Sequence, residues 1–291
     1  MLVPIGFVVV LSCVFGGYWL GGGHLEVVLH ALPLEFMVIG GAGIGAFLIS
    51  SDGHLLKETA RNFKLVFAGP KYKKAHYIEI LTLLFLIFKT LKTKGPKAIE
   101  KDIEAPHESE LFKSFPLFQK DHHAVTFVCD YLRLIVLRVE NPLEIDALME
   151  QELGVISEEL HHGSHALQTV ADGLPALGIV AAVLGVIKTM GSIDQPPAIL
   201  GEMIGSALVG TFLGVFLSYG IVGPFASKVK GIHDSDCKYY HAIRAAFIAH
   251  LNGSQPAIAV EFGRKVIADT VRPSFAELDE AVTSIGQSKA A

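Results

Sequence analysis

Four apolar runs along the chain approach the length of a membrane-spanning helix. They are "LVPIGFVVVLSCVFGGYWL" at residues 2–20, "LEFMVIGGAGIGAFLIS" at 34–50, "GLPALGIVAAVLGVIKTMG" at 173–191 and "IGSALVGTFLGVFLSYGIVGPFA" at 204–226. An α-helix needs about 20 residues to cross a bilayer, with a range of roughly 17–25. The pattern therefore predicts four transmembrane helices, of which the second is the shortest.

The segment between the second and third runs has a different, helical pattern. Apolar residues recur at helical spacing, for example at Val128, Leu132 and Ile135, between breaks at Gly-Pro and Asn-Pro dipeptides. No stretch alternates as a strand would. The fold class that we predict is all-α: a polytopic membrane protein with four transmembrane helices and a helical cytoplasmic domain.

Two stretches of this segment bear on where the membrane begins and ends. The run "YIEILTLLFLIF" at 77–88 contains Glu79 and is too short to span, so it predicts a buried or interfacial helix outside the membrane. The stretch from Pro142 to Thr169 carries apolar residues at helical spacing up to the third run. We expect it to continue into that run as one long helix.

Lysine and arginine positions predict the orientation. All of these residues except Lys188 lie between Lys57 and Arg138 or from Lys228 onwards, and the expected loops at 21–33 and 192–200 contain none. Because cytoplasmic flanks carry an excess of Lys and Arg, we expect both termini in the cytoplasm. The predicted domains are 1–51 (first two membrane helices), 52–170 (cytoplasmic helical domain), 171–226 (last two membrane helices) and 227–291 (cytoplasmic tail).

Composition agrees with a membrane protein that has a large water-exposed part. The hydrophobic fraction is 51% and the mean hydropathy is +0.47, while the net charge of -5 argues against nucleic acid as a partner. The three cysteines, Cys13, Cys129 and Cys237, are far apart and predict neither a disulfide framework nor a zinc site.

Small residues follow one face of the third and fourth runs. Gly178, Ala182 and Gly185 recur at intervals of three and four in the third, and Gly210 and Gly214 belong to a similar stripe in the fourth. Small residues let membrane helices approach closely. One interpretation is packing of the chain on itself; the other, favoured by two adjacent stripes, is a lining that accepts a helix of another copy or another protein.

Ionisable groups are missing where an ion path would need them. The middles of the last two runs offer only neutral groups such as Thr211 and Tyr219, and we expect Glu35 and Glu202 near the outer ends. Ion paths across a bilayer normally use an ionisable group at depth. The sequence therefore predicts an obligatory partner with its own membrane carboxylate.

Two prolines lie at corresponding depths of these runs, Pro175 near the start of the third and Pro224 near the end of the fourth. A helical proline removes one hydrogen bond and bends the helix. Each proline alone suggests a helix boundary, whereas the pair suggests a hinge that passes motion to the cytoplasmic helices.

Enzyme motifs and metal sites find little support. His161 and His165 share a helical face, but no third ligand completes a metal site, and we interpret them as a solvated face. No phosphate loop, nucleophile elbow or zinc-protease motif is present. We expect no catalytic residues, metal or cofactor. The charged run at 89–104 is either an ordinary solvent-exposed surface or a polar contact surface for a large partner.

Several blocks of the chain resemble the MotA family of flagellar stator proteins. They are "GIGAFL" (43–48), "EKDIEAPHESELF" (100–112), "DYLRLIV" (130–136), "LPALGIVAAVLGVI" (174–187), "VGTFLGVFLSYGIVGP" (209–224), "AVEFGRK" (259–265) and "RPSF" (272–275). The resemblance runs almost from end to end of the chain.

The resemblance implies partners and roles for individual residues. Five subunits of this family surround two copies of MotB, which supplies the ion-binding aspartate, and the complex conducts ions inward. The cytoplasmic part pushes on the rotor protein FliG. The family's membrane prolines fall on Pro175 and Pro224, its fourth-span threonine on Thr211, and its acidic rotor-contact residue on Glu100. Lys92 stands where an arginine is usual, which keeps the charge but loses the forked donor geometry.

The resemblance also frames the alternatives. It implies a homo-pentamer in the bacterial inner membrane that couples ion flow to torque, and Ala182, where sodium-driven relatives tend to carry threonine, favours protons. The alternative is an energiser of the ExbB or TolQ type, which drives outer-membrane processes and has three spans. A membrane enzyme would need a reactive side chain within a span, and the sequence shows none.

Overall fold

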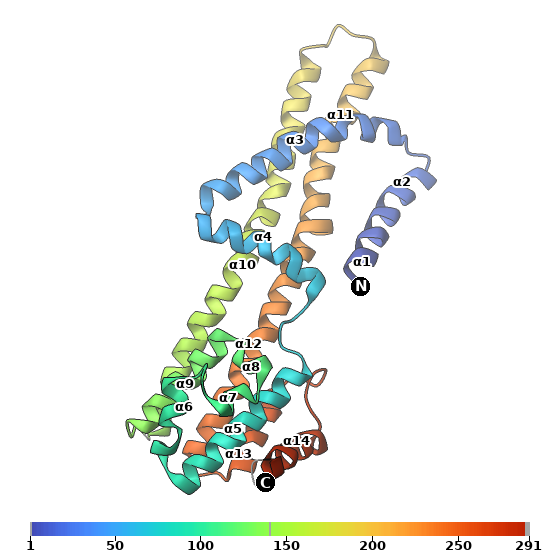
Figure 1. Cartoon of the computed structure of the whole chain (residues 1–291). Helices are drawn as coiled ribbons and strands as arrows, with labels where there is room; N and C mark the ends of the chain where they lie inside the picture. The colour runs from blue at the N-terminus through green and yellow to red at the C-terminus, as the bar shows by residue number, and fades with distance from the viewer. Residues whose placement is uncertain (1, 140, 289–291) are drawn as a thin grey trace. The chain divides into compact units, whose positions relative to one another are not determined.

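The computed structural model of the chain describes residues 2–139 and 141–288, which form helices joined by turns (Figure 1). The longer helices are α1 (Leu2–Leu11), α3 (Leu25–Ser50), α4 (Gly53–Ala68), α5 (Lys74–Lys94), α9 (His122–Val136), α10 (Pro142–Met190), α11 (Pro197–Val215), α12 (Gly223–Leu251), α13 (Pro256–Val266) and α14 (Phe275–Ser288). The short ones are η1 (Ser12–Gly16), α2 (Gly17–Leu20), η2 (Pro96–Ile99), α6 (Glu100–Glu104), α7 (Glu110–Lys113), α8 (Pro116–Gln119) and η3 (Phe216–Val222).

The helices form two compact units. Met1–Gly69 and Leu160–Ile232 make the first, which we call the membrane unit. Pro70–Glu159 and His233–Ala291 make the second, which we call the aromatic unit after its core. Helices α10 and α12 contribute residues to both units.

Four stretches of continuous helix are long and apolar enough to cross a membrane: Leu2–Leu20, Leu25–Ser50, Pro142–Met190 and Pro197–Leu251. The prediction of four membrane helices is confirmed. The expected loop at 21–33 is wrong, because α3 already begins at Leu25 and contains Pro33. Proline is tolerated within membrane helices, where neighbouring groups satisfy the freed backbone. The second span is therefore not the short one.

The predicted continuity of the third span is also confirmed, since α10 runs unbroken from Pro142 to Met190. Pro175 lies inside this helix, so it is not a helix boundary. Pro224 is the second residue of α12, and α12 directly follows η3, a π-helical segment. A proline cannot donate the usual backbone hydrogen bond, and π-helical turns are a common adjustment inside a longer helix. The chain thus remains helical through both prolines.

Helix α4 packs its polar face inward. The Asp52 side chain caps it by accepting a hydrogen bond from the Leu55 N–H at 2.7 Å. Glu58 and Asn62 are buried, and a Cβ built on Gly163 of α10 would lie only 2.3 Å from Asn62 Nδ2. The aromatic rings of the helix point outward instead, with Phe67 67% exposed. This arrangement suits a helix lying at a membrane surface.

The same contact between α4 and α10 corrects one expectation from the sequence. His161 is buried, so it does not belong to a solvated face. Its ring lies 6.2 Å from that of His165, centroid to centroid. Among the described residues no group of three or more metal-ligating side chains is found.

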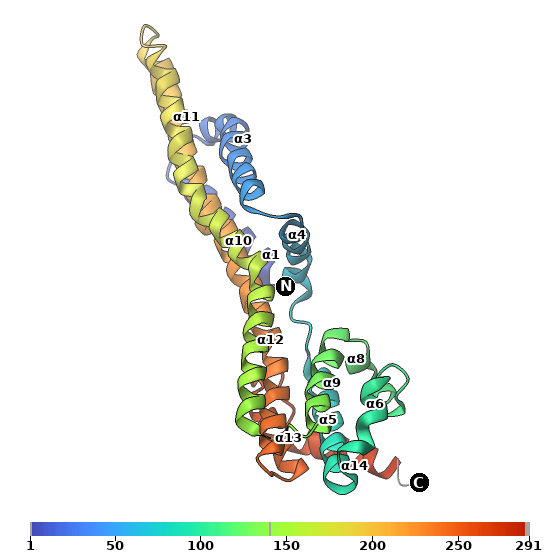
Figure 2. The ribbon, with the colours of Figure 1, turned by 90° about the vertical axis from the view of Figure 1, so that its left-hand side faces the viewer.

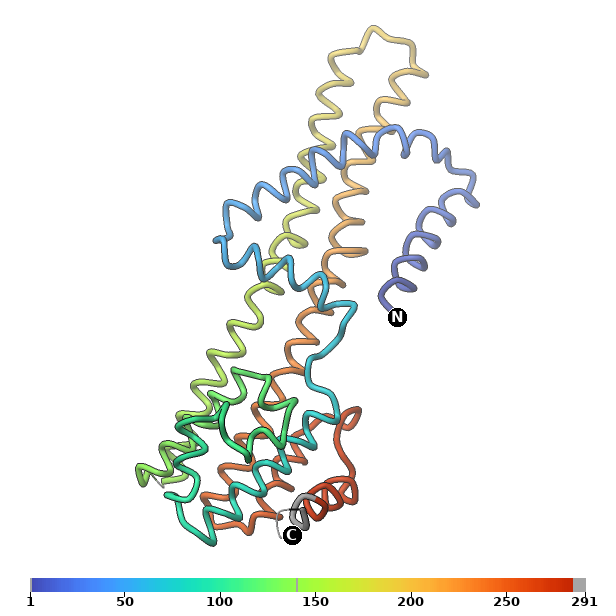
Figure 3. Tube along the Cα trace, in the orientation of Figure 1, coloured from blue at the N-terminus to red at the C-terminus, as the bar shows by residue number. Residues whose placement is uncertain are grey.

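The aromatic unit has a large core built around α5. Its fully buried rings include Tyr77, Phe88, Phe112, Phe127 and Phe247. The run at 77–88 is buried in this core, as predicted for a helix outside the membrane. A Cβ built on Gly263 of α13 would lie 2.7 Å from the Ala242 carbonyl oxygen, so this glycine permits a close approach to α12. Figure 3 shows α13 and α14 beside α5.

Buried polar groups fix the chain where it enters the aromatic unit. The Tyr72 hydroxyl donates to Asp121 Oδ2 at 2.7 Å, and its ring stacks on Tyr239 with centroids 3.9 Å apart. Asp236 accepts hydrogen bonds from the Lys71 and Tyr72 N–H groups. Burial raises the pKa of Asp236 above its ordinary value, and these two backbone donors act in the opposite direction.

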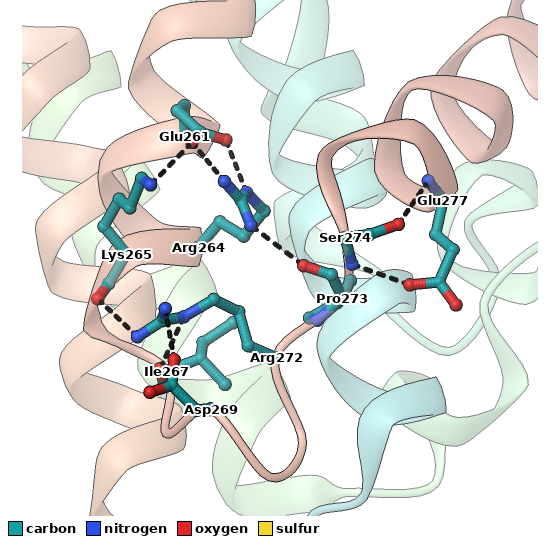
Figure 4. A network of polar contacts seen from close by, with 9 residues as sticks. All are labelled: Glu261, Arg264, Lys265, Ile267, Asp269, Arg272, Pro273, Ser274 and Glu277. Atoms are coloured by element: carbon teal, nitrogen blue, oxygen red, sulfur yellow. Dashed lines mark hydrogen bonds and ion pairs between the residues drawn. The ribbon is translucent and has the colours of Figure 1, made fainter.

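A second polar network holds the C-terminal helices (Figure 4). The buried Arg264 guanidinium binds Glu261 on its own helix and donates to the Pro273 carbonyl at 2.9 Å. Glu277 accepts from the Ser274 N–H at 2.6 Å and from Lys74 of α5 at 2.6 Å. The motifs "AVEFGRK" and "RPSF" are therefore joined physically through Arg264.

Candidate functional site

The third and fourth membrane helices contact each other through their glycines. A Cβ built on Gly178 would lie 2.8 Å from the Gly210 carbonyl oxygen and 3.0 Å from Gly214 Cα. One built on Gly214 would lie 2.7 Å from the Leu174 carbonyl oxygen. One built on Gly185 would meet Ala207 Cβ at 2.6 Å. Because the obstructing atoms are mainly backbone, no larger side chain fits along this seam.

The predicted lining residues consequently fall into two groups. Gly178, Gly185, Gly210 and Gly214 are occupied by contacts within the chain, as the first of the two interpretations expects. Ala182 and Thr211 are half-buried, and Tyr219 is 71% exposed. A contact of any of these residues with the helix of a second protein stays a prediction.

Glu35 lies where the sequence predicted only neutral groups. Its carboxylate Oε2 is 2.8 Å from the position that a Cβ on Gly210 would take, and Ala181 Cβ and the Ala182 N surround the same point at 3.0 and 3.1 Å. Figures 1 and 2 show α3 passing across α11 in this region. The carboxyl group of α3 thus reaches the seam between α10 and α11.

The expectation that Glu35 lies near the outer end of its helix is wrong. It follows the start of α3 by ten residues, or about 15 Å of helix. Gly210 follows the start of α11 by 13 residues, or about 20 Å. Both residues therefore lie in the body of their helices and not at the helix ends. The error arose from placing the helix start at 34; the apolar residues from Leu25 onward were the signal that would have corrected it.

The two prolines differ in their surroundings. Pro175 is half-buried within α10, while Pro224 is exposed and lines an apolar cavity of about 260 Å³. Leu2, Phe7 and Val66 form other parts of that cavity wall. The structure therefore leaves room for side-chain movement beside Pro224.

Lys92 and Glu100 both lie on the surface of the aromatic unit. Lys92 is in the last turn of α5 and Glu100 is the first residue of α6, with the turn of η2 between them. Neither side chain forms an ion pair with another described residue. The His250 ring stacks on Phe88 at 4.3 Å, and its pKa is lowered by burial and, secondarily, by the charge of Lys92. Lys92 and Glu100 are thus unpaired charges of opposite sign at one edge of the unit.

Comparisons with known proteins cover nearly the whole chain. Residues 4–95 match the family model described as motility protein A N-terminal, and residues 120–258 match that of the MotA/TolQ/ExbB proton channel family. Motility protein A of Salmonella typhimurium is 42% identical over 285 residues, covering 98% of this chain and 96% of that protein, and the Escherichia coli protein gives the same values. The solved structure of C. jejuni MotAB superposes with a TM-score of 0.70 at 20% sequence identity, covering 93% of this chain and 97% of that one.

Proposed function

The chain belongs to the motility protein A family, and on that premise we propose how it acts as the stator subunit of a flagellar motor. The match to motility protein A at 42% identity over 98% of the chain carries this conclusion. The four apolar helices agree with a subunit of a membrane channel, and the aromatic unit supplies a folded body outside the apolar spans. The activity is coupling of ion flow to rotation, and no enzymatic reaction is involved.

The partner in the membrane is a MotB-type protein, and it supplies the ion-binding aspartate. The C. jejuni structure that this chain resembles is a structure of MotAB, which supports the pairing. Two copies of that partner, surrounded by five copies of the present chain, make the proposed assembly. The proposed ion-path and partner-helix lining is the surface of the packed pair α10 and α11. Its glycines, Gly178, Gly185, Gly210 and Gly214, hold the two helices together, and Ala182, Thr211 and Tyr219 complete the proposed lining.

Protons are the proposed ion, and they move inward across the inner membrane. The side chain of Ala182 has no oxygen that could bind a metal cation. The positive residues that flank the second and fourth spans support a cytoplasmic position for both termini. The domain boundaries proposed from the sequence, at 51, 170 and 226, follow the same orientation.

The energy of each proton sets what kind of step it drives. One charge that moves through about 100 mV releases roughly 2.3 kcal/mol. That amount biases two packings of helices but does not break a core. We propose that Pro175 and Pro224 are the hinge of this step, with the cavity beside Pro224 giving it room.

The rotor contact is proposed at Lys92 and Glu100, with FliG as the rotor protein. Their exposure and their lack of an ion pair with other described side chains support a role toward a charged partner. Exposed charged contacts of this kind guide and orient a partner as it approaches, and they add little to the affinity of the complex.

Deletion of the gene tests the function as a whole. We expect cells that keep intact flagella but do not swim, and recovery of swimming when the gene is restored. Intact motility together with failed iron uptake or envelope defects would contradict the stator function and indicate the ExbB or TolQ type instead.

Replacement of one proline tests the hinge separately. The variant Pro175→Leu should reduce swimming while the complex still assembles, whereas Pro33→Leu, in the exposed part of α3, serves as the matched control. Normal swimming with Pro175→Leu would rule out the hinge.

A further inference from the structure

Glu35 differs from the other acidic residues of the membrane helices. Glu26 of α3 and Glu202 of α11 are exposed, and Asp172 of α10 accepts a hydrogen bond from Gln168. Glu35 Oε2 is enclosed and has no hydrogen-bond partner among the described residues, while the Glu35 residue as a whole is half-buried. A single buried carboxyl oxygen therefore lies between three membrane helices without a partner.

Glycine at position 210 makes this placement possible. The Glu35 oxygen lies 2.8 Å from the position that a Cβ at residue 210 would take, and the Ala181 methyl group lies 3.0 Å from the same position. The other charged or titratable groups on the apolar stretches of these helices are His30 and Glu26 on α3, Lys188 on α10 and Glu202 on α11. All four are exposed and more than one helical turn away along their helices. No cation of the described chain thus neutralises Glu35.

An ionised carboxylate is very costly in such surroundings. Burial of an unpaired charge in an apolar medium is so unfavourable that the group takes up a proton instead. Ionisable residues within membrane segments are accordingly rare and mark ion pathways or proton relays. A packing contact alone would be made at lower cost by an apolar side chain.

We propose that Glu35 is a proton-binding site of this chain itself and relays protons to the membrane partner's carboxylate. The proposal rests on the proposed function and adds a second proton site to the path. In the relay step the O–H bond of the protonated Glu35 breaks, and the proton passes, directly or through a water molecule, to a carboxylate oxygen of the partner, where a new O–H bond forms. Glu35 is left as a carboxylate and takes its next proton from water on the outer side.

Proton flow in cells tests the relay. The chain is co-expressed with its one-span partner, cytoplasmic acidification is followed with a pH-sensitive fluorescent protein, and the amount of assembled complex is measured by immunoblot. Glu35→Gln keeps the size and hydrogen-bonding capacity of the side chain but cannot exchange a proton. We expect it to lower the flux per complex several-fold, Glu35→Asp to retain most of it, and the matched control Glu26→Gln to behave as wild type.

The outcomes separate this inference from the proposed function. If the wild-type complex acidifies the cytoplasm and Glu35→Gln does so equally well, the relay is overturned while the stator function stands. If the wild-type complex carries no protons, the proposed function fails and the relay with it. Retained flux in Glu35→Gln and loss in Glu35→Asp would show a role in packing and would also overturn the relay.

A chemical measurement on the wild-type complex covers the case in which the variants do not assemble. Dicyclohexylcarbodiimide reacts with protonated carboxyl groups in apolar surroundings. Mass spectrometry of the treated complex at neutral pH should find the adduct on Glu35 and not on Glu26 or Glu202. Absence of the adduct from Glu35 would overturn the proposal.

Discussion

The membrane unit and the aromatic unit differ in the residues that pack inside each of them. In the membrane unit α10 and α11 approach backbone to backbone at Gly178, Gly210 and Gly214. The core of the aromatic unit is built from large side chains, such as Phe88 and Phe247, whose ring centroids are 5.4 Å apart. One chain thus uses the smallest residues for one core and the largest for the other.

The difference follows from the two solvents. In water, burial of an aromatic side chain is strongly favourable, so a core gains from large rings. In lipid the surroundings are as apolar as the side chains, and helices gain instead from close packing. Exposed apolar residues of the membrane unit, such as Ile179 and Val183, are consistent with a lipid or protein environment. The comparison predicts that loss of side-chain volume is the damaging change in the aromatic unit and that added volume is the damaging change in the membrane unit.

The largest expected effect is the loss of a ring from the aromatic core. Phe247→Ala should lower the free energy of unfolding by about 3–5 kcal/mol, because it removes a fully buried ring and leaves a cavity. Thermal unfolding of the purified protein in detergent measures this. Phe262→Ala, on a residue 55% exposed, is the matched control and should change little.

Enlargement of a residue should be the damaging change in the membrane unit. Gly214→Val places new atoms against the Leu174 carbonyl and the Gly178 backbone. Overpacking of this kind costs about 1–3 kcal/mol, and here the obstructing atoms cannot rotate away. We expect less assembled complex on native gels and loss of swimming. Gly41→Val, at a site with no atom within 4 Å of the added Cβ, should assemble normally; equal loss in both variants would contradict the close-packing account.

A smaller effect is expected from loss of the Arg264 hydrogen bonds that connect the last helices. Arg264→Gln removes the charged donor to Glu261 and to the Pro273 carbonyl. An unsatisfied buried partner costs about 1–3 kcal/mol, so earlier proteolytic cleavage after residue 266 should accompany the loss of stability. Lys265→Gln, whose side chain is 64% exposed, should have no such effect.

The smallest effect should depend on pH. Hydrogen bonds from Lys74 and from Ser274 lower the pKa of Glu277 from 4.5 to about 2. A lowered pKa in the folded state means that the stabilisation is complete above about pH 4.5 and is lost as the pH falls toward 2. Glu277→Gln should therefore reduce the melting temperature slightly at neutral pH and leave it unchanged near pH 2. Asp279→Asn is the control; a difference that persists at low pH would contradict the assignment.

The membrane architecture could be predicted from the sequence because it depends on long, local patterns. Run length gave the four spans, and the apolar residues at helical spacing from Pro142 to Thr169 gave the single long helix. The burial of 77–88 followed from its length and from Glu79. These properties do not require knowledge of which segments meet.

What could not be predicted depends on pairing between distant segments. Nothing local shows that Gly178 faces Gly210 and Gly214, or that Asn62 lies against Gly163. The environment of Glu35 required two facts together: an earlier start of α3, and the alignment of its eleventh residue with a glycine of another helix. The resemblance to a family located Lys92 and Glu100, but only the structure shows that neither charge is paired with another described side chain.

Because Lys92 and Glu100 are exposed and unpaired, they affect the lifetime of a contact with a partner more than its binding free energy. At physiological ionic strength the field of an exposed charge fades within about 8 Å, so the rotor contact that we propose for these two residues gains little free energy and dissociates readily. A stator that binds and releases its rotor at every step needs a contact that forms and breaks easily. A tightly paired or buried charge would not provide such a contact.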